Sequence, residues 1–124
     1  GRTEVMFGPP GHAYLFLVYG LHLCVNVVTG AGAAVLIRAL EPCTGLRGLR
    51  TDGPGRLTRA LGLTLKLNAH PLDRQPLFVA GGQPVAARHI VQSPRIGVAY
   101  AGEWAGRLLR FYDGRSGFVS RPRG

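Results

Sequence analysis

The segment from Tyr14 to Thr29 restricts the fold of this chain most strongly. It is rich in β-branched and aromatic residues and contains a single glycine, Gly20, near its middle. Two such apolar runs around a glycine predict a β-hairpin with Tyr19 and Gly20 at or near the turn. The first arm is apolar on both faces, which is typical of a strand covered on both sides. The second arm alternates, with Leu21, Leu23, Val25 and Val27 on one face and His22, Cys24, Asn26 and Val28 on the other.

The large aromatic residue at the hairpin turn has two interpretations. Turns meet water, so Tyr19 at the tip of a stiff hairpin could act as a wedge between stacked bases if the partner is a nucleic acid. Alternatively, it is a corner residue that packs on its own domain. The hairpin pattern alone leaves both interpretations open.

The charge of the chain favours a polyanionic partner. Lysine and arginine number 15 against 6 aspartates and glutamates, which gives a net charge of +9. Nucleic acid is preferred to a membrane as the partner, since no segment is long and apolar enough to span a bilayer. A basic protein without such a partner is the alternative.

The remaining pattern predicts an α+β fold. We expect a single domain over residues 1–124, with a curved, mostly antiparallel sheet, a protruding hairpin and a few short helices. A buried strand is expected at 34–37 and further short strands at 77–79, 85–87, 96–100 and 108–112. Trp104 is expected in the core. A helix is expected over 56–63, with its apolar face made by Leu57, Ala60 and Leu61.

Few polar residues stand out as candidates for chemistry. Arg38 interrupts an apolar run, where an unpaired charge is costly. It either points outward at a bend, or pairs with Glu41, or is directed into a polar pocket. The histidines and the two cysteines lack the spacing of metal ligands, and no nucleotide-binding motif is present, so we expect no metal and no cofactor.

Several blocks of sequence, in one order, resemble the alkyladenine (3-methyladenine) DNA glycosylase family. They include Val-Met-Phe-Gly-Pro-Pro-Gly-His-Ala-Tyr at 5–14 and Leu-Ile-Arg-Ala-Leu-Glu-Pro at 36–42. Further blocks lie at 18–22, 24–28, 53–57, 95–105 and 108–112. The resemblance covers nearly the whole chain, and ordered blocks are more specific than a single short motif.

This resemblance implies base excision repair by a monofunctional glycosylase. Such an enzyme flips an alkylated purine out of duplex DNA and hydrolyses its N-glycosidic bond with an activated water. By position, Tyr19 would intercalate, Phe16 would stack on the flipped base, and Asn26 would read the purine edge and reject the amino group of guanine. Arg38 and the main-chain carbonyl of Ile96 would hold the attacking water.

The resemblance also implies the partners and the location. The partner would be double-stranded DNA with alkylated or deaminated purines, bound without a cofactor by a monomer that does not associate with membranes. We expect it in the bacterial cytoplasm, at the nucleoid, or in the nucleus of a eukaryote, and not as a secreted protein. The positions that would contact the DNA backbone are Arg2, Thr3, Leu21, His22, Gly55 and Arg56.

One part of the family pattern is not matched. The family's general base is a glutamate in a segment that would precede Gly1, and a short insertion is missing where Glu4 joins Val5. General-base catalysis contributes about 10²–10⁴ in rate, so residues 1–124 alone are expected to bind weakly and excise little. Two alternatives follow: a truncated, catalytically inactive DNA-binding remnant of the family, and a small basic RNA-binding protein.

Overall fold

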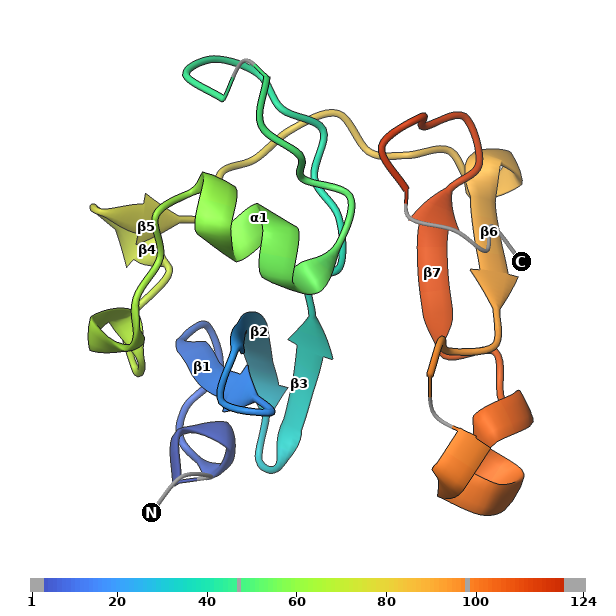
Figure 1. Cartoon of the computed structure of the whole chain (residues 1–124), viewed down its shortest axis with the longest axis horizontal. Helices are drawn as coiled ribbons and strands as arrows, with labels where there is room; N and C mark the ends of the chain where they lie inside the picture. Colours follow the sequence, from blue (N-terminus) through green and yellow to red (C-terminus); the bar gives the residue numbers. More distant parts are fainter. Residues whose placement is uncertain (1–3, 47, 98, 120–124) are drawn as a thin grey trace. The chain divides into compact units, whose positions relative to one another are not determined.

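The computed structural model describes residues 4–46, 48–97 and 99–119. The chain divides into two compact units, residues 1–81 and 82–124 (Figure 1). The first unit contains a three-stranded sheet and an α-helix, and the second contains a two-stranded sheet. The prediction of a single domain over residues 1–124 is not tested by this division and stays a prediction.

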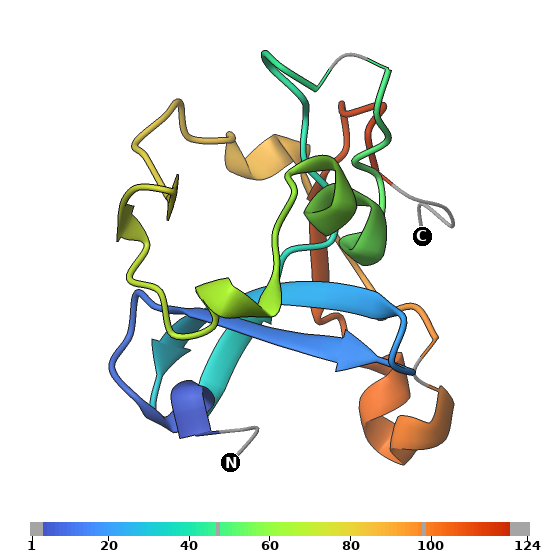
Figure 2. The same ribbon diagram turned by 60° about the vertical axis from the view of Figure 1, so that its left-hand side comes forward.

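The predicted hairpin is confirmed as the centre of the first unit. Strand β1 (Ala13–Val18) pairs antiparallel with β2 (His22–Gly30), which pairs in turn with β3 (Ala33–Leu36). Figure 2 shows β1 and β2 side by side over their length. The pairing runs from Ala13 opposite Val27 to Val18 opposite His22. The apolar alternation in the sequence therefore translates directly into the register of this sheet.

A small hydrophobic core holds the hairpin against helix α1 (Pro54–Ala60). Its buried members are Ala13, Leu15, Val25, Leu57 and Leu72. The helix begins after Gly53, which has an extended backbone, and Pro54 is its first residue. Proline is common at this position because an amide hydrogen in the first helical turn has no partner within the helix, and proline has no amide hydrogen. The Thr58 hydroxyl, on the same helix, donates to the main-chain oxygen of Leu23 in β2 at 2.8 Å.

Two details of the predicted elements in this unit are wrong. The helix ends at Ala60, before a left-handed Gly62, so Leu61 lies outside it and is 38% exposed, and the buried helix residues are Leu57 and Thr58. The strand expected to be buried at 34–37 is β3, an edge strand in which Val35 is 53% exposed. A strand paired on one side only is not enclosed by the sheet.

Short elements complete the first unit. They are two 3-10 helices, η1 (Glu4–Phe7) and η2 (Leu65–Leu67), and the two-stranded ribbon of β4 (Asp73–Arg74) and β5 (Leu77–Phe78). His12 forms a bridge with Pro71, and the Ala13 amide donates to the His70 oxygen at 2.8 Å. These contacts fasten the segment 70–74 to the beginning of β1, which is the end opposite the hairpin turn.

The second unit is built on one antiparallel pair. Strand β6 (Ile90–Ser93) pairs with β7 (Arg110–Asp113), accompanied by 3-10 helices η3 (Ala87–His89) and η4 (Ala99–Gly106). Arg110 is 4% exposed, and its Nη1 donates to the Ser93 hydroxyl oxygen at 3.2 Å. Its guanidinium also lies over the Tyr112 ring, 4.7 Å from the centroid.

Several predictions for the second unit are wrong. Residues 85 and 86 are irregular and Ala87 begins η3, while the expected strand at 96–100 is replaced in its described part by a turn and by η4. Gly97, with a φ of 72°, breaks the extended path. Trp104 is 50% exposed rather than in the core, and the Arg107 guanidinium lies 4.4 Å from its ring centroid.

The predicted fold class is confirmed. Antiparallel sheets with a few short helices make this an α+β protein. The strands of the described residues form three sheets, of which the three-stranded sheet carries the protruding hairpin.

Candidate functional site

The hairpin ends in a tight turn that projects an aromatic side chain into solvent. The Leu21 amide donates to the Val18 oxygen at 3.1 Å and closes the turn. Tyr19 and Gly20 have φ values of 54° and 68°, and two positive values at the central positions define a type I′ turn. The Tyr19 side chain is 92% exposed and that of Leu21 73% exposed. The tip is therefore an apolar surface made of these two side chains.

Tyr19 adopts this conformation at a cost. A residue with a Cβ atom in the left-handed region loses about 1–2 kcal/mol, and type I′ turns favour Asn-Gly for this reason. Gly20 fits its position, but Tyr19 does not. A strained residue that is also almost fully exposed gains no packing energy in return, so the corner-residue interpretation does not account for it.

The predicted base-pocket residues share one face of the sheet. Phe16 lies opposite Cys24, and Tyr14 lies opposite Asn26. Paired residues, and residues two positions apart in a strand, point to the same face, so these four side chains lie on one side of the sheet. The rings of Tyr14 and Phe16 are 5.3 Å apart between centroids and tilted by 33°. Asn26 is 7% exposed, and its Nδ2 donates to the main-chain oxygen of Tyr14 at 3.2 Å. An aromatic pair and one fixed amide thus lie next to each other.

Arg38 extends the same face from the third strand. The Ile37 amide donates to the Val25 oxygen at 3.1 Å, which continues the β2–β3 ladder one step past Leu36. Arg38 then falls on the side of Cys24 and Asn26, and it is half-buried. Burial raises the pKa of the Cys24 thiol, and the positive charge of Arg38 opposes that rise, which is consistent with their proximity. Phe16, Asn26 and Arg38 are therefore brought together.

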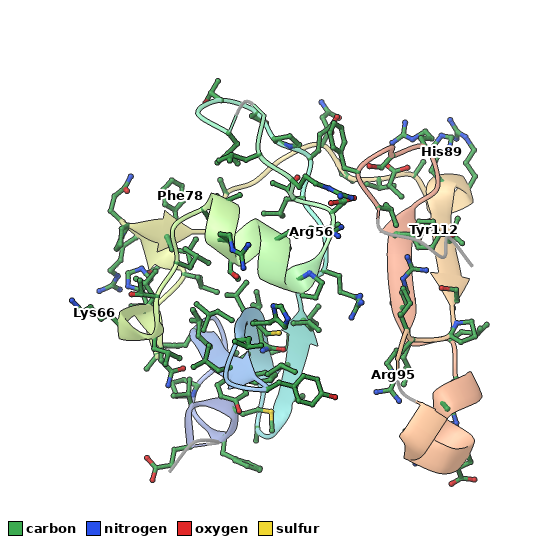
Figure 3. The ribbon with its side chains drawn as sticks, in the orientation of Figure 1. Arg56, Lys66, Phe78, His89, Arg95 and Tyr112 are labelled. Carbon is green, nitrogen blue, oxygen red and sulfur yellow. The ribbon has the colours of Figure 1, made fainter. Side chains whose placement is uncertain are left out.

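Three of the predicted DNA-backbone residues also lie close together. A Cβ atom on Gly55 would be 3.4 Å from the Cβ and the Nδ1 of His22, so the first turn of α1 contacts the beginning of β2. Arg56 follows Gly55 and is labelled in Figure 3 at the first turn of α1. Its Nη1 lies 3.3 Å from Asp52 Oδ1. The hairpin turn, His22 and the start of α1 thus form one continuous region.

Three further predicted site residues lie outside the described part of the first unit. Ile96 belongs to the second unit and is half-buried there, and its water-holding role stays a prediction. Arg2 and Thr3 lie outside the described residues.

One neighbour of the predicted pocket was not singled out from sequence. Tyr14 is 5% exposed, and it contacts Phe16 through its ring and Asn26 through its main-chain oxygen. Side chains alternate between the two faces of a strand, so the sequence of the first hairpin arm places Tyr14 and Phe16 on one face. This alternation could have identified Tyr14 as a neighbour of the predicted pocket.

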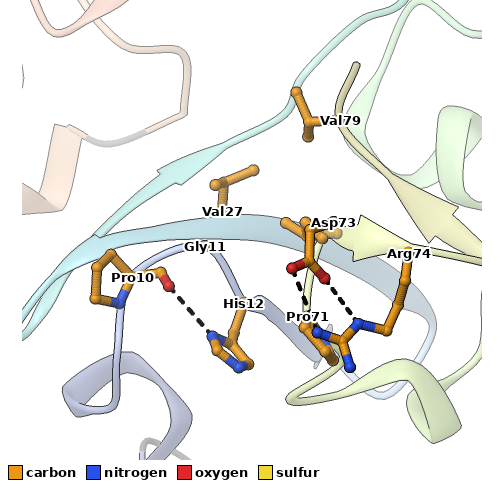
Figure 4. A pocket seen from close by; sticks show the side chains of 9 residues that line it. Pro10, Gly11, His12, Val27, Pro71, Asp73, Arg74 and Val79 are labelled. Atoms are coloured by element: carbon orange, nitrogen blue, oxygen red, sulfur yellow. Dashed lines mark hydrogen bonds and ion pairs between the residues drawn. The ribbon is translucent and has the colours of Figure 1, made fainter. Parts of the chain in front are cut away.

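A separate pocket lies at the far end of β1. It has a volume of about 530 Å³ and is shown in Figure 4. The side chains of His12, Asp73 and Arg74 line it together with Val27 and Val79. Asp73 and Arg74 form an ion pair at its edge, with 2.8 Å between Arg74 Nε and Asp73 Oδ1. None of the predicted site residues lines this pocket.

The described residues contain neither a metal-binding cluster nor a membrane-spanning helix. No group of three or more histidine, cysteine, aspartate or glutamate side chains there could hold a metal ion. The helices in that part of the chain are too short or too polar to cross a bilayer.

Comparison with known proteins gives concordant matches. The family model described as Methylpurine-DNA glycosylase (MPG) matches residues 1–116. A Myxococcus xanthus protein named "Putative 3-methyladenine DNA glycosylase" is 54% identical, over 97% of this chain and 64% of its own length. Proteins with the same name from Legionella pneumophila (strain Corby) and Carboxydothermus hydrogenoformans are each 47% identical over 97% of this chain, which covers 67% and 69% of them. The chain thus spans about two thirds of the length of these relatives.

Proposed function

The chain belongs to the methylpurine-DNA glycosylase family, and from this premise we propose that the natural protein containing it excises damaged purines from DNA. The substrate class is duplex DNA with an alkylated or deaminated purine. The reaction is hydrolysis of the N-glycosidic bond by an activated water, as the first step of base excision repair. No cofactor is required, and the protein acts as a monomer, either at the nucleoid in the bacterial cytoplasm or in the nucleus of a eukaryote.

A single observation carries this proposal. Tyr19 is 92% exposed and held in a left-handed conformation at the end of a two-stranded finger. A base inside duplex DNA is out of reach of an active site, and flipping it costs a few kcal/mol. A rigid aromatic ring that fills the vacated space contributes about 1–3 kcal/mol by stacking, which offsets much of that cost. Exposure, strain and rigidity are the properties that such a wedge requires.

The neighbouring face suits a flipped purine. Phe16 offers an aromatic ring for stacking, and a cationic alkylated base gains a further cation–π interaction on such a ring. Asn26, with its amide held by the Tyr14 carbonyl, has one fixed orientation in which to read the purine edge. An amide held in one orientation discriminates between purines better than a mobile one, since it cannot rotate away from a substituent that does not fit.

The remaining residues take positioning roles. The Arg38 guanidinium holds the attacking water from the same face. The DNA backbone beside the tip is contacted by Leu21, His22, Gly55 and Arg56.

Binding to two duplexes tests the proposal. One duplex contains a single hypoxanthine, and the other has adenine at that position. Tyr19→Ala should remove most of the preference for the hypoxanthine duplex, while Arg56→Ala should weaken binding to both alike. An unchanged preference in Tyr19→Ala would refute the wedge role.

A further inference from the structure

A connected ionic group is formed by Arg50, Asp52 and Arg56. Arg50 donates from Nε to Asp52 Oδ1 at 3.1 Å and from Nη2 to Asp52 Oδ2 at 2.7 Å. Arg56 donates from Nη1 to Asp52 Oδ1 at 3.3 Å. The hydrogen bonds from Arg50 are the main reason that the pKa of Asp52 lies below its usual value, so the carboxyl stays ionised. One carboxylate thus orients two guanidinium groups.

The two arginines face water more than the carboxylate does. The side chains of Arg50 and Arg56 are 66% and 50% exposed, and that of Asp52 is 24% exposed. Each guanidinium has five N–H donors, and the contacts with Asp52 use only some of them. Within the described residues no other group accepts from Nη1 of Arg50, or from Nε and Nη2 of Arg56. The group keeps a net charge of +1 and several donors directed at solvent.

This group lies next to the hairpin tip. Arg56 follows Gly55, where a Cβ atom would be 3.4 Å from the His22 side chain. His22 pairs with Val18, and the turn that carries Tyr19 lies between those two residues. An anion bound by the arginines would therefore sit beside the element that we propose to enter DNA.

We propose that Arg50, together with Arg56, binds consecutive phosphodiester groups of the DNA strand that crosses the hairpin tip. This rests on the proposed function and adds Arg50, which lies in none of the family sequence blocks. A guanidinium presents parallel N–H donors that match two oxygens of one phosphate. Because Asp52 already orders both side chains, less rotational freedom is lost when they bind.

The salt dependence of binding to a lesion-free duplex tests this assignment. The natural protein is compared with Arg50→Gln at KCl concentrations from 50 to 200 mM. Each phosphate contact contributes about 0.9 to the slope of log K against log salt. We expect Arg50→Gln to reduce the steepness of that slope by about 0.9, so its affinity deficit shrinks about 3.5-fold across the salt range.

Arg74→Gln is the matched control. Arg74 is 65% exposed and pairs through Nε and Nη2 with the two oxygens of its neighbour Asp73, as Arg50 does with Asp52 (Figure 4). The substitution removes the same unit charge from the same unit of the chain. Arg74 lies near the beginning of β1, about 17 Å along the strand from the tip, which exceeds the Debye length at 0.15 M salt. We expect it to keep the wild-type slope.

The outcomes separate the inference from the function that it rests on. A slope lowered in Arg50→Gln and kept in Arg74→Gln supports the phosphate contact. Equal slopes for both variants and for the unaltered protein overturn it, even when that protein binds and excises normally. If the unaltered protein shows no salt-dependent DNA binding at all, the proposed function itself fails. Because both arginines are exposed, unchanged thermal melting of each variant serves as the folding check.

Discussion

Asn26 and Tyr14 lie directly opposite each other in the hairpin, and the Asn26 Nδ2 donates a hydrogen bond to the Tyr14 main-chain oxygen at 3.2 Å. A carbonyl oxygen can only accept, so the nitrogen end of the amide must face the backbone of β1. The oxygen end is then the one left for another partner. The residue that we propose to read the purine edge is in this way fixed by the strand that carries Phe16.

That contact predicts a pH-dependent effect of Asn26→Asp. An ionised carboxylate would place an acceptor against the Tyr14 oxygen, whereas a protonated one could still donate. Burial and the Tyr14 oxygen therefore raise the pKa of the introduced carboxyl in the folded state, and the positive charge of Arg38 on the same face opposes that rise, as it does for the Cys24 thiol. The contribution of the introduced carboxyl to stability is greatest below the unfolded value of about 3.9 and is lost as pH rises through the folded value. Denaturant unfolding should show a larger deficit against wild type at pH 7 than at pH 4.5.

A matched control is Thr29→Asp, at an exposed position of the same strand. It should show a similar, small change in unfolding free energy at both pH values. A deficit for Asn26→Asp that does not vary with pH would contradict an Asn26 amide that donates to the Tyr14 oxygen.

Thr58→Val should loosen the attachment of α1 to the hairpin. The Thr58 side chain is 2% exposed, and its hydroxyl contacts the main-chain oxygens of Leu23 at 2.8 Å and Gly55 at 3.0 Å. Valine has the same shape but cannot donate, so we expect a loss of about 1–3 kcal/mol in unfolding free energy. Thr64→Val, at an exposed helix cap, should cost less, about 0.5–1 kcal/mol. Equal losses of unfolding free energy in the two variants would contradict a stabilising hydrogen bond from the buried Thr58 hydroxyl to Leu23.

Asp113 should titrate far below an ordinary aspartate. Hydrogen bonds from Arg115 lower the pKa of its carboxyl to about 2. Since the folded value is depressed, the stability that this pair adds is complete above the unfolded value near 3.9 and disappears as pH falls through about 2. Carboxyl-carbon NMR of the natural protein should give that midpoint, and Arg115→Gln should return it toward 3.9. A normal midpoint in the unaltered protein would contradict the ion pair.

The hairpin was predictable because its information is local. Alternating apolar residues specify the register of β1 and β2, and Gly20 marks the turn. The same alternation places Tyr14 and Phe16 on one face. Arg38 required the resemblance to a family, since an arginine in an apolar run is equally consistent with a solvent-facing bend.

Other features depend on contacts that the sequence does not display. Nothing local indicates that Gly55 approaches His22 across more than thirty residues of sequence. Trp104 was misplaced because aromatic residues are buried on average, whereas this one covers an arginine at the surface. A left-handed tyrosine also contradicts turn preferences, so only the structure reveals the strain at Tyr19.

That strain predicts a separation of stability from function. Tyr19→Asn keeps the turn type, since asparagine tolerates positive φ, and should raise the free energy of unfolding by about 0.5–1 kcal/mol. Leu21→Asn, next to it in the turn, relieves no positive φ and should not increase stability. Thermal melting of the two variants measures the difference, and a destabilised Tyr19→Asn would contradict the strained turn.

The wedge is tested most directly by the single-turnover rate at which the natural protein and its Tyr19→Asn variant release hypoxanthine from a duplex. Stacking worth about 1–3 kcal/mol corresponds to a rate about 5- to 150-fold lower in the variant, although its fold is at least as stable. Rates that agree within about twofold would contradict the wedge, because the exposed ring would then contribute nothing to opening the duplex.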